Sequence, residues 1–159
     1  MLNYWLFKSE PETFGFDRLR REGRTEWSGV RNYQARNNMQ AMRDGDLGFF
    51  YHSSTAVPGI AGICKVVREA YPDFTAWDKS SEYYDPKSPG RKPIWMMVDV
   101  AFERDLPRFV TLAELRTNAW LDGMVLLKRG SRLSVQPVTA AEWELILRLA
   151  EAPAPPHPA

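Results

Sequence analysis

The sequence predicts an α+β protein in which helices surround a mixed, curved sheet or small β-barrel. Three observations support this class. Several strand-like segments follow one another directly or are joined by turns, which a regular alternation of parallel strands and helices would not produce. Helical patterns occur at only a few separate places. The 159 residues are 44% hydrophobic and 26% charged, a composition typical of one globular domain.

Five segments have the apolar, aromatic or alternating pattern of strands. They cover residues 4–7, 47–51, 60–70, 98–102 and 132–138. The clearest is 98–102, because Val98, Val100 and Phe102 alternate with more polar residues, as in a strand with one buried face. Pro11 and Pro137 limit the first and last of these strands.

Helices are predicted at four places. Residues 17–23 form one or two surface turns, and 33–42 form an amphipathic helix with a stripe of small and apolar side chains. Thr111 with Glu114, and Thr139 with Glu142, have the spacing of a capping box and mark two further helix starts. The ring-rich segment 72–93 is predicted to be an ordered, functional loop.

Charge and composition exclude several classes of protein. A net charge of +1 does not indicate general attraction to a polyanion, so a nucleic-acid site must be local. One cysteine and two histidines are too few for a zinc site, and no disulfide can form within the chain. No segment approaches the roughly 20 apolar residues of a membrane span. We therefore expect a cytoplasmic protein, or a nuclear one in a eukaryote, without metal, cofactor or membrane contact.

Catalytic patterns are weak. Cys64 lies in an apolar strand, which indicates packing rather than nucleophilic chemistry. The paired carboxylates Glu10 with Glu12 and Asp44 with Asp46 lie beside turns, where solvated charges are the simpler interpretation. The sequence therefore predicts no catalytic residue.

Residues 27–36 have a composition suited to ligand binding. Two rings, two guanidinium groups and two carboxamides surround one glycine at the start of a predicted helix. Rings offer stacking faces for a base, amides offer paired donors and acceptors, and arginines favour phosphate. The same residues also fit a core role for Trp27 and Tyr33 with surface arginines.

Five motifs, in this order, strongly resemble the EVE domain family. They are Lys8-Ser-Glu-Pro11, the segment 27–37, Phe50-Tyr-His-Ser53, Tyr84-Asp-Pro-Lys87 and the segment 129–137. The resemblance runs from about residue 3 to residue 149. It implies a domain over residues 1–151, followed by a disordered Pro/Ala tail over 152–159.

The resemblance implies a PUA-like mixed β-barrel of about five to six strands with peripheral helices, related to YTH and ASCH domains. Such a protein would be a non-catalytic reader that binds one modified base, methylated or hydroxymethylated and in DNA or RNA, in an aromatic-lined pocket. The ligand-binding residues carried over from the motifs are Lys8, Ser9, Glu10, Trp27, Val30, Arg31, Asn32, Tyr33, Tyr51, His52, Ser53, Arg132, Leu133 and Ser134.

Within this set, Trp27 is the expected stacking platform for the base. Asn32 and either Ser9 or Ser134 would read its polar edge. Contacts with the flanking phosphates are expected from Arg31, Arg36 and Arg132.

Two other functions fit the same residues. A nucleoside or small-molecule binding module would use the pocket without a polymer, consistent with the low net charge. An ASCH-like hydrolase would use Lys8, Glu10 and His52 as acid and base. The resemblance selects neither a particular base nor one polymer, and we expect a monomer.

Overall fold

The computed structural model describes residues 2–155 of the chain. Within this range the elements follow in the order β1 (Tyr4–Ser9), α1 (Pro11–Phe14), α2 (Phe16–Glu22), β2 (Arg24–Glu26), α3 (Tyr33–Ala41), β3 (Leu47–His52), β4 (Gly59–Pro72), η1 (Phe74–Trp77), β5 (Met96–Thr111), α4 (Leu112–Arg116), η2 (Ala119–Leu121), η3 (Val125–Leu127), β6 (Val135–Val138) and α5 (Ala140–Glu151), where η marks a 3₁₀ helix.

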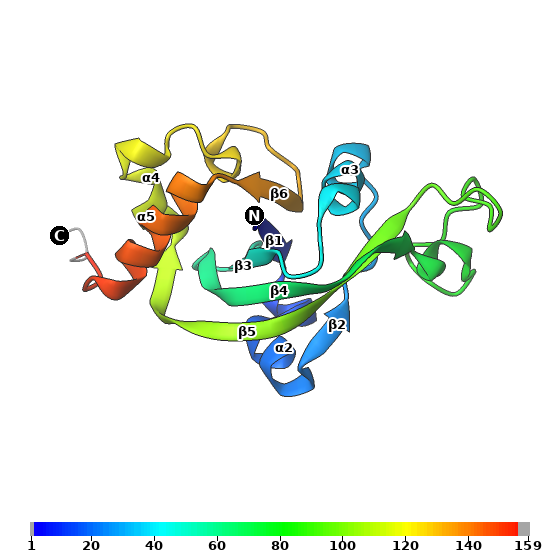
Figure 1. Cartoon of the computed structure of the whole chain (residues 1–159), viewed down its shortest axis with the longest axis horizontal. Coiled ribbons are helices and arrows are strands. Elements are labelled where there is room, and N and C mark those ends of the chain that lie inside the picture. The colour runs from blue at the N-terminus through cyan, green and yellow to red at the C-terminus, as the bar shows by residue number, and fades with distance from the viewer. Residues whose placement is uncertain (1, 156–159) are drawn as a thin grey trace.

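The six strands of residues 2–155 form one mixed sheet in the order β2-β5-β4-β3-β1-β6. The β1–β3 pair is parallel and the other neighbours are antiparallel. The sheet is strongly curved (Figure 1). It remains open, because the edge strands β2 and β6 have only three and four residues and each pairs with a single neighbour. The predicted α+β class with a curved mixed sheet is therefore confirmed, but the sheet does not close into a barrel.

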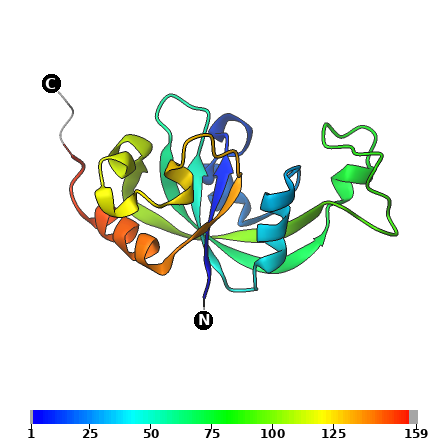
Figure 2. The ribbon, with the colours of Figure 1, turned by 90° about the horizontal axis from the view of Figure 1, so that it is seen from above.

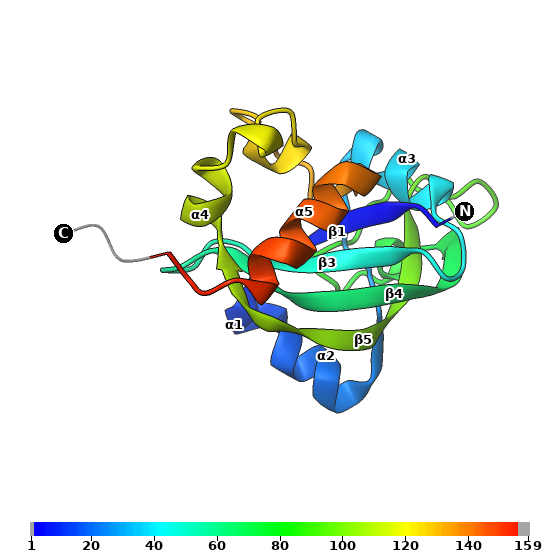
Figure 3. The same cartoon turned by 60° about the vertical axis from the view of Figure 1, so that its left-hand side comes forward.

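Side chains are buried on both faces of the sheet. Along β1, Trp5 and Phe7 belong to one hydrophobic cluster and Leu6 to the other, as the alternation of a strand requires. Helices α2 and α3 cover the first cluster, to which α3 contributes Met39. Helix α5 lies across the other face (Figure 3), where Trp143 stacks on a strand residue. The sheet is thus a central layer between two groups of helices.

The two predicted capping boxes differ. At α5, Thr139 Oγ1 accepts from the amide of Glu142 at 3.1 Å, and the Glu142 carboxylate accepts from the amide of Thr139 at 2.9 Å. At α4, Thr111 Oγ1 accepts from the amide of Glu114, but the Glu114 carboxylate pairs with Arg108 at 2.6 Å. The reciprocal bond is therefore present only at α5, since a buried ion pair takes the second carboxylate.

Strand β5 is much longer than the predicted 98–102 and contains Pro107. Its pairing with β4 moves from Gly62 opposite Asp105 to Ile60 opposite Val110. The intervening residues 106–109 form an irregular stretch, where a residue without an amide proton loses no ladder bond. Elements α1 and β2 were not predicted, because four and three residues are too few to show a period.

A projecting segment connects β4 to β5, and we call residues 73–95 the arm (Figures 1 and 2). Its rings anchor it internally. The indole of Trp77 donates to the carbonyl of Ser88 at 2.7 Å, and the indole of Trp95 donates to Asp85 Oδ2 at 2.7 Å. These bonds give two of the rings of the arm a structural role.

No helix within residues 2–155 has the length and apolar character needed to cross a membrane. After α5, residues 152–155 are exposed and form neither helix nor strand, and the carbonyl of Ala152 accepts from Arg108 Nε at 2.6 Å. The rest of the predicted tail, 156–159, lies outside the described residues.

Candidate functional site

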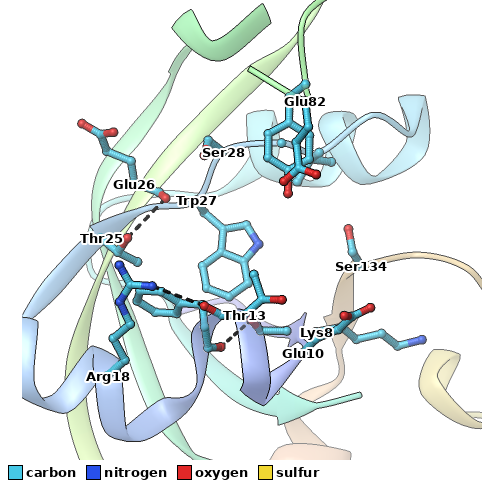
Figure 4. Close-up of a pocket in the computed structure, with 15 residues that line it drawn as sticks. Lys8, Glu10, Thr13, Arg18, Thr25, Glu26, Trp27, Ser28, Glu82 and Ser134 are labelled. Carbon is cyan, nitrogen blue, oxygen red and sulfur yellow. Dashed lines mark hydrogen bonds between the residues drawn. The ribbon is translucent and has the colours of Figure 1, made fainter. Parts of the chain in front are cut away.

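A pocket of about 550 Å³ lies where the end of β1, the helices α1 and α2, the segment after β2 and the arm meet (Figure 4). Ligand sites for small molecules have volumes of about 300–1,000 Å³. The lining residues are Lys8, Ser9, Glu10, Thr13, Phe14, Arg18, Thr25, Glu26, Trp27, Ser28, Gly29, Val30, Glu82, Tyr83 and Ser134. Segments far apart in the sequence therefore build a single cavity.

Trp27 lies in the middle of this pocket (Figure 4). Its amide donates to the carbonyl of Val98 at 2.7 Å, and its ring packs edge-to-face against Phe7, Phe14 and Phe50 at centroid distances of 5.1, 6.5 and 5.7 Å. Only 9% of the residue is exposed. Trp27 is therefore both a residue of the hydrophobic core and a residue that lines the pocket.

The indole N–H of Trp27 makes no hydrogen bond with the described residues, and in Figure 4 it faces the open side of the pocket. By contrast, the indoles of Trp5, Trp77 and Trp95 all donate to protein acceptors at 2.7–3.0 Å. The Trp27 N–H remains accessible from the pocket and can donate to a ligand. Trp27 therefore presents both a ring and a donor to a molecule in the pocket.

Charged side chains surround the ring. Three carboxylates, those of Glu10, Glu26 and Glu82, line the pocket together with Lys8 and Arg18. Partial burial lowers the pKa of Lys8. Because carboxylates only accept hydrogen bonds, the pocket favours a ligand edge that carries N–H or O–H donors.

Two serines tie the pocket walls together. Ser9 Oγ donates to the carbonyl of Phe14 at 2.6 Å, so its hydroxyl proton is already used and only its lone pairs can serve a ligand. The backbone carbonyl of Ser134 accepts from the amide of Lys8 at 2.8 Å. Of the two serines expected to read a base edge, Ser134 therefore has the less committed side chain.

The wall opposite Lys8 depends on a close contact between Gly29 and Tyr83. Gly29 has a φ of +82°, and a Cβ there would lie 2.7 Å from the Tyr83 ring. Its amide donates to Asp73 Oδ2 at 2.8 Å. A side chain at this position would push the Tyr83 ring out of place, so the pocket requires glycine here.

Arg31 stabilises the same wall without lining the pocket. Its Nε and Nη2 donate to the carbonyl of Tyr83 at 3.1 and 2.7 Å, and Nη2 also donates to Thr75 Oγ1. Its Nη1 donates to Asp73 Oδ2 and to the carbonyl of Val30, both at 3.0 Å. All five N–H donors are used within the chain, so Arg31 acts on the pocket by positioning Tyr83.

Six of the predicted ligand-binding residues line the pocket: Lys8, Ser9, Glu10, Trp27, Val30 and Ser134. The others lie around it. At the start of α3, Asn32 caps the helix with its side chain, and Tyr33 is 60% exposed with its ring 5.0 Å from that of Trp95. The Arg36 guanidinium lies over the Tyr33 ring and donates to the arm backbone.

Two further predicted residues precede Ser134. Arg132 is exposed in the loop before β6, and Leu133 packs against the core on the α3 side of the sheet. Neither lines the pocket, so the expected phosphate contact of Arg132 stays a prediction.

The motif at the end of β3 also lies outside the pocket. Tyr51 is buried in the cluster under α5, and burial raises its pKa. Ser53 donates its amide to the carbonyl of Ser9. His52 Nε2 accepts from the amide of Phe16 at 3.1 Å, and burial lowers its pKa. The motif therefore supports the pocket wall, and His52 is held as a neutral hydrogen-bond acceptor.

Stability should consequently depend on the protonation of His52. Since its pKa is lower in the folded than in the unfolded state, its contribution is present above the usual pKa of 6.5 and is lost as the pH falls through the folded value. His52→Gln retains an acceptor without titrating. In urea unfolding between pH 8 and pH 5, the variant should lose less stability than the wild type; equal losses would contradict this role.

The pocket residues that the motifs did not predict are mostly small, charged or on short elements: Thr13, Phe14, Arg18, Thr25, Glu26, Ser28, Gly29, Glu82 and Tyr83. Ser28 and Gly29 lie inside a motif that pointed to the site, and Tyr83 directly precedes another. Thr13, Phe14, Thr25 and Glu26 lie on α1 and β2, which the sequence does not indicate, whereas Arg18 lies on α2 and Glu82 in the arm.

Residues 2–155 contain no cluster of His, Cys, Asp or Glu able to hold a metal. Cys64 is buried as predicted, and burial raises the pKa of its thiol. The expectation that Asp44 and Asp46 are both solvated is wrong for Asp46, which is 2% exposed and accepts from the indole of Trp5 at 3.0 Å.

The open mixed sheet between helices is similar in fold to a YTH domain. That domain, from Zygosaccharomyces rouxii and solved with N6-methyladenosine RNA, superimposes with a TM-score of 0.53 over 99% of this chain and 90% of that chain, at 15% identity. The EVE domain profile matches residues 3–149, and the chain belongs to the EVE domain family.

Relatives confirm the resemblance seen in the motifs. Thymocyte nuclear protein 1 of Homo sapiens is 45% identical over 168 residues, covering 94% of this chain and 74% of that protein. A solved protein of Pseudomonas putida is 50% identical with a TM-score of 0.90, covering 92% of this chain and 99% of that chain. The human protein, solved in complex with DNA containing 5-methylcytosine, is 43% identical with a TM-score of 0.89, covering 96% and 99%.

Proposed function

We propose that this protein is a non-catalytic reader that takes one modified base of a nucleic acid into the pocket around Trp27. The observation that carries the proposal is the Trp27 side chain, whose ring and unbonded indole N–H line a cavity of about 550 Å³. Extracting a base from a duplex costs a few kcal/mol, and stacking on an aromatic ring returns about 1–3 kcal/mol. Hydrogen bonds at the base edge supply the rest.

Cytosine methylated at C5 is the base we propose first. Its exocyclic amine can donate to the Glu10 or Glu82 carboxylate, and its ring acceptors can take the indole N–H of Trp27. Phe14 and Val30 offer apolar contact for the methyl group. The human relative bound to DNA containing 5-methylcytosine supports this choice. Methylated adenine in RNA presents a similar donor and is the alternative ligand.

The same proposal includes the contact residues, the domain bounds, the oligomeric state and the localisation of the protein. Lys8, Ser9, Glu10, Trp27, Val30 and Ser134 contact the base directly, while Arg36 and Arg132 contact phosphates. Residues 1–151 are the binding domain and residues 152–159 lie outside it. We propose that the protein works as a monomer, in the cytoplasm or, in a eukaryote, in the nucleus, as the name of the human relative suggests.

A non-catalytic role fits the arrangement of titratable groups. Of the three residues considered for a hydrolase, Lys8 and Glu10 line the pocket, whereas His52 lies outside it with Nε2 accepting from a backbone amide. The histidine of the hydrolase alternative therefore does not reach a ligand, and only Lys8 and Glu10 are in position for acid–base chemistry. Incubating the protein with modified nucleosides and their triphosphates, followed by product analysis, should detect no conversion.

Equilibrium binding tests the proposal. Labelled single- and double-stranded oligonucleotides carry cytosine, 5-methylcytosine, 5-hydroxymethylcytosine or N6-methyladenine at one position, and RNA versions form a second set. We expect one modification to bind roughly tenfold more tightly than its unmodified base, the magnitude of one methyl group in an apolar pocket. Equal binding of every oligonucleotide, or tight binding of free nucleosides alone, would contradict the reader.

A further inference from the structure

The arm (residues 73–95) forms part of the pocket and also extends away from it. Glu82 and Tyr83 line the pocket, and the rest of the arm projects beyond the sheet, at the end of the molecule opposite α4 and α5 (Figures 1 and 2). A polymer whose base occupies the pocket must continue past this wall. The arm therefore lies where flanking nucleotides would run.

The turn at the tip of the arm is basic. Residues 87–92 contain Lys87, Arg91 and Lys92 and no acidic residue. All three side chains belong to exposed residues, and none forms an ion pair with the described residues. Their charges are thus free to neutralise phosphate.

The acidic residues of the arm are mostly committed to internal bonds. The Asp73 carboxylate is buried against Arg31. Asp78 accepts from the amide and hydroxyl of Ser80, and Asp85 accepts from the indole of Trp95. These bonds hold the arm in shape, and the positive side chains of residues 87–92 are free of ion pairs with these carboxylates.

Aromatic faces accompany these charges. Phe74, Trp77 and Tyr84 are 46%, 40% and 37% exposed. The bond from the Trp77 indole to the carbonyl of Ser88 places this ring beside the basic turn. Exposed rings interleaved with cations are typical of surfaces that bind single-stranded or distorted nucleic acid. Internal bonds already order the arm, so binding loses little conformational entropy.

The pocket itself offers few phosphate contacts, because Lys8 and Arg18 are its only lining cations and Arg18 pairs with Glu22. Glu10, Glu26 and Glu82 line it, and Arg31 has no free donor. We propose that the arm binds the phosphate backbone beside the base held in the pocket, through Lys87, Arg91 and Lys92, with Trp77 and Tyr84 stacking on neighbouring bases. This inference rests on the proposed function and adds a second surface to the phosphate contacts proposed for Arg36 and Arg132.

A charge-matched pair of variants tests the arm. Arg91→Ala/Lys92→Ala removes two cations from the tip, and Arg116→Ala/Arg148→Ala removes two exposed cations from α4 and α5 at the other end. The affinity of each variant for oligonucleotides containing 5-methylcytosine or cytosine is measured over a range of salt concentrations. The free nucleoside 5-methyl-2′-deoxycytidine serves as a probe that contacts the pocket alone.

We expect the arm variant to bind both oligonucleotides less tightly than wild type. The slope of the logarithm of its binding constant against the logarithm of the salt concentration should be smaller in magnitude by about 1–2. The preference for 5-methylcytosine and the nucleoside affinity should not change, and the control variant should behave as wild type. Arm and control variants with the same slope would overturn the inference. A wild type without any base preference, whose oligonucleotide binding still depends on the arm, would instead overturn the proposed function alone.

Discussion

Replacing Trp27 with leucine is expected to abolish the preference for a modified base. The substitution removes the stacking face and the indole donor, while an apolar side chain remains against Phe7 and Phe50. Loss of one base-stacking contact corresponds to about 1–3 kcal/mol, or roughly a five- to hundredfold weaker affinity. The free energy of unfolding should also fall by about 2–4 kcal/mol, because the ring is almost completely buried.

Trp120→Leu is the matched control for this variant. Trp120 is 87% exposed and does not line the pocket. Binding is measured with modified and unmodified oligonucleotides at a temperature where both variants are folded, as checked by circular dichroism. A folded Trp27→Leu protein that kept the full preference would contradict the assignment of this ring to the base.

Replacing Asp73 with alanine should give the largest loss of stability among single substitutions in the arm. Its side chain is completely buried and accepts from Gly29, Arg31 and Thr75 at 2.5–3.0 Å. Removing it leaves Arg31 largely buried without its counter-ion, which costs about 3–5 kcal/mol in comparable sites. Because the same bonds hold Gly29 against Tyr83, affinity for nucleic acid should fall as well.

Asp78→Ala is the control for Asp73→Ala. The Asp78 carboxylate lies in the same arm but is exposed and accepts only from Ser80, so its loss should cost much less stability than that of Asp73. Urea unfolding measures both. Equal stability losses in the two variants, or a loss below about 1 kcal/mol for Asp73→Ala, would contradict the stabilising role of Asp73.

The stability contributed by the ionised Asp73 carboxylate should also be lost in acid. Burial alone would raise the pKa of this carboxyl, but hydrogen bonds from Thr75, Gly29 and Arg31 together lower it below its usual 3.8. A group with a lowered folded pKa contributes stability above its unfolded pKa and loses it as the pH falls through the folded value. The acid sensitivity of wild type should therefore exceed that of Asp73→Ala.

The elements with a strong period were predictable from the sequence. The alternation of residues 98–102 and the helical stripe of 33–42 correspond to parts of β5 and α3, because repeated burial of one face leaves a clear pattern. The open edge of the sheet was not predictable. It depends on how far β2 and β6 extend, and three or four residues carry no such signal.

The lining of the pocket was predicted in part. Motifs identify side chains that share a segment, such as Trp27 and Val30, and both line the pocket. They do not distinguish a residue that faces the cavity from one that supports it. Arg31 looked like a phosphate ligand, yet its donors are used by Asp73 and the arm backbone, a contact across more than 40 positions in the sequence.

The most direct test of the account is the indole N–H resonance of Trp27 in a ¹⁵N–¹H correlation spectrum. The chain has six tryptophans, and the Trp27 signal is assigned by its absence from Trp27→Phe. On titration with an oligonucleotide containing 5-methylcytosine, this resonance should shift strongly because a stacked base lies beside it, while that of Trp120 should not move. Saturable binding that leaves the Trp27 resonance unchanged would contradict the pocket as the site of the base.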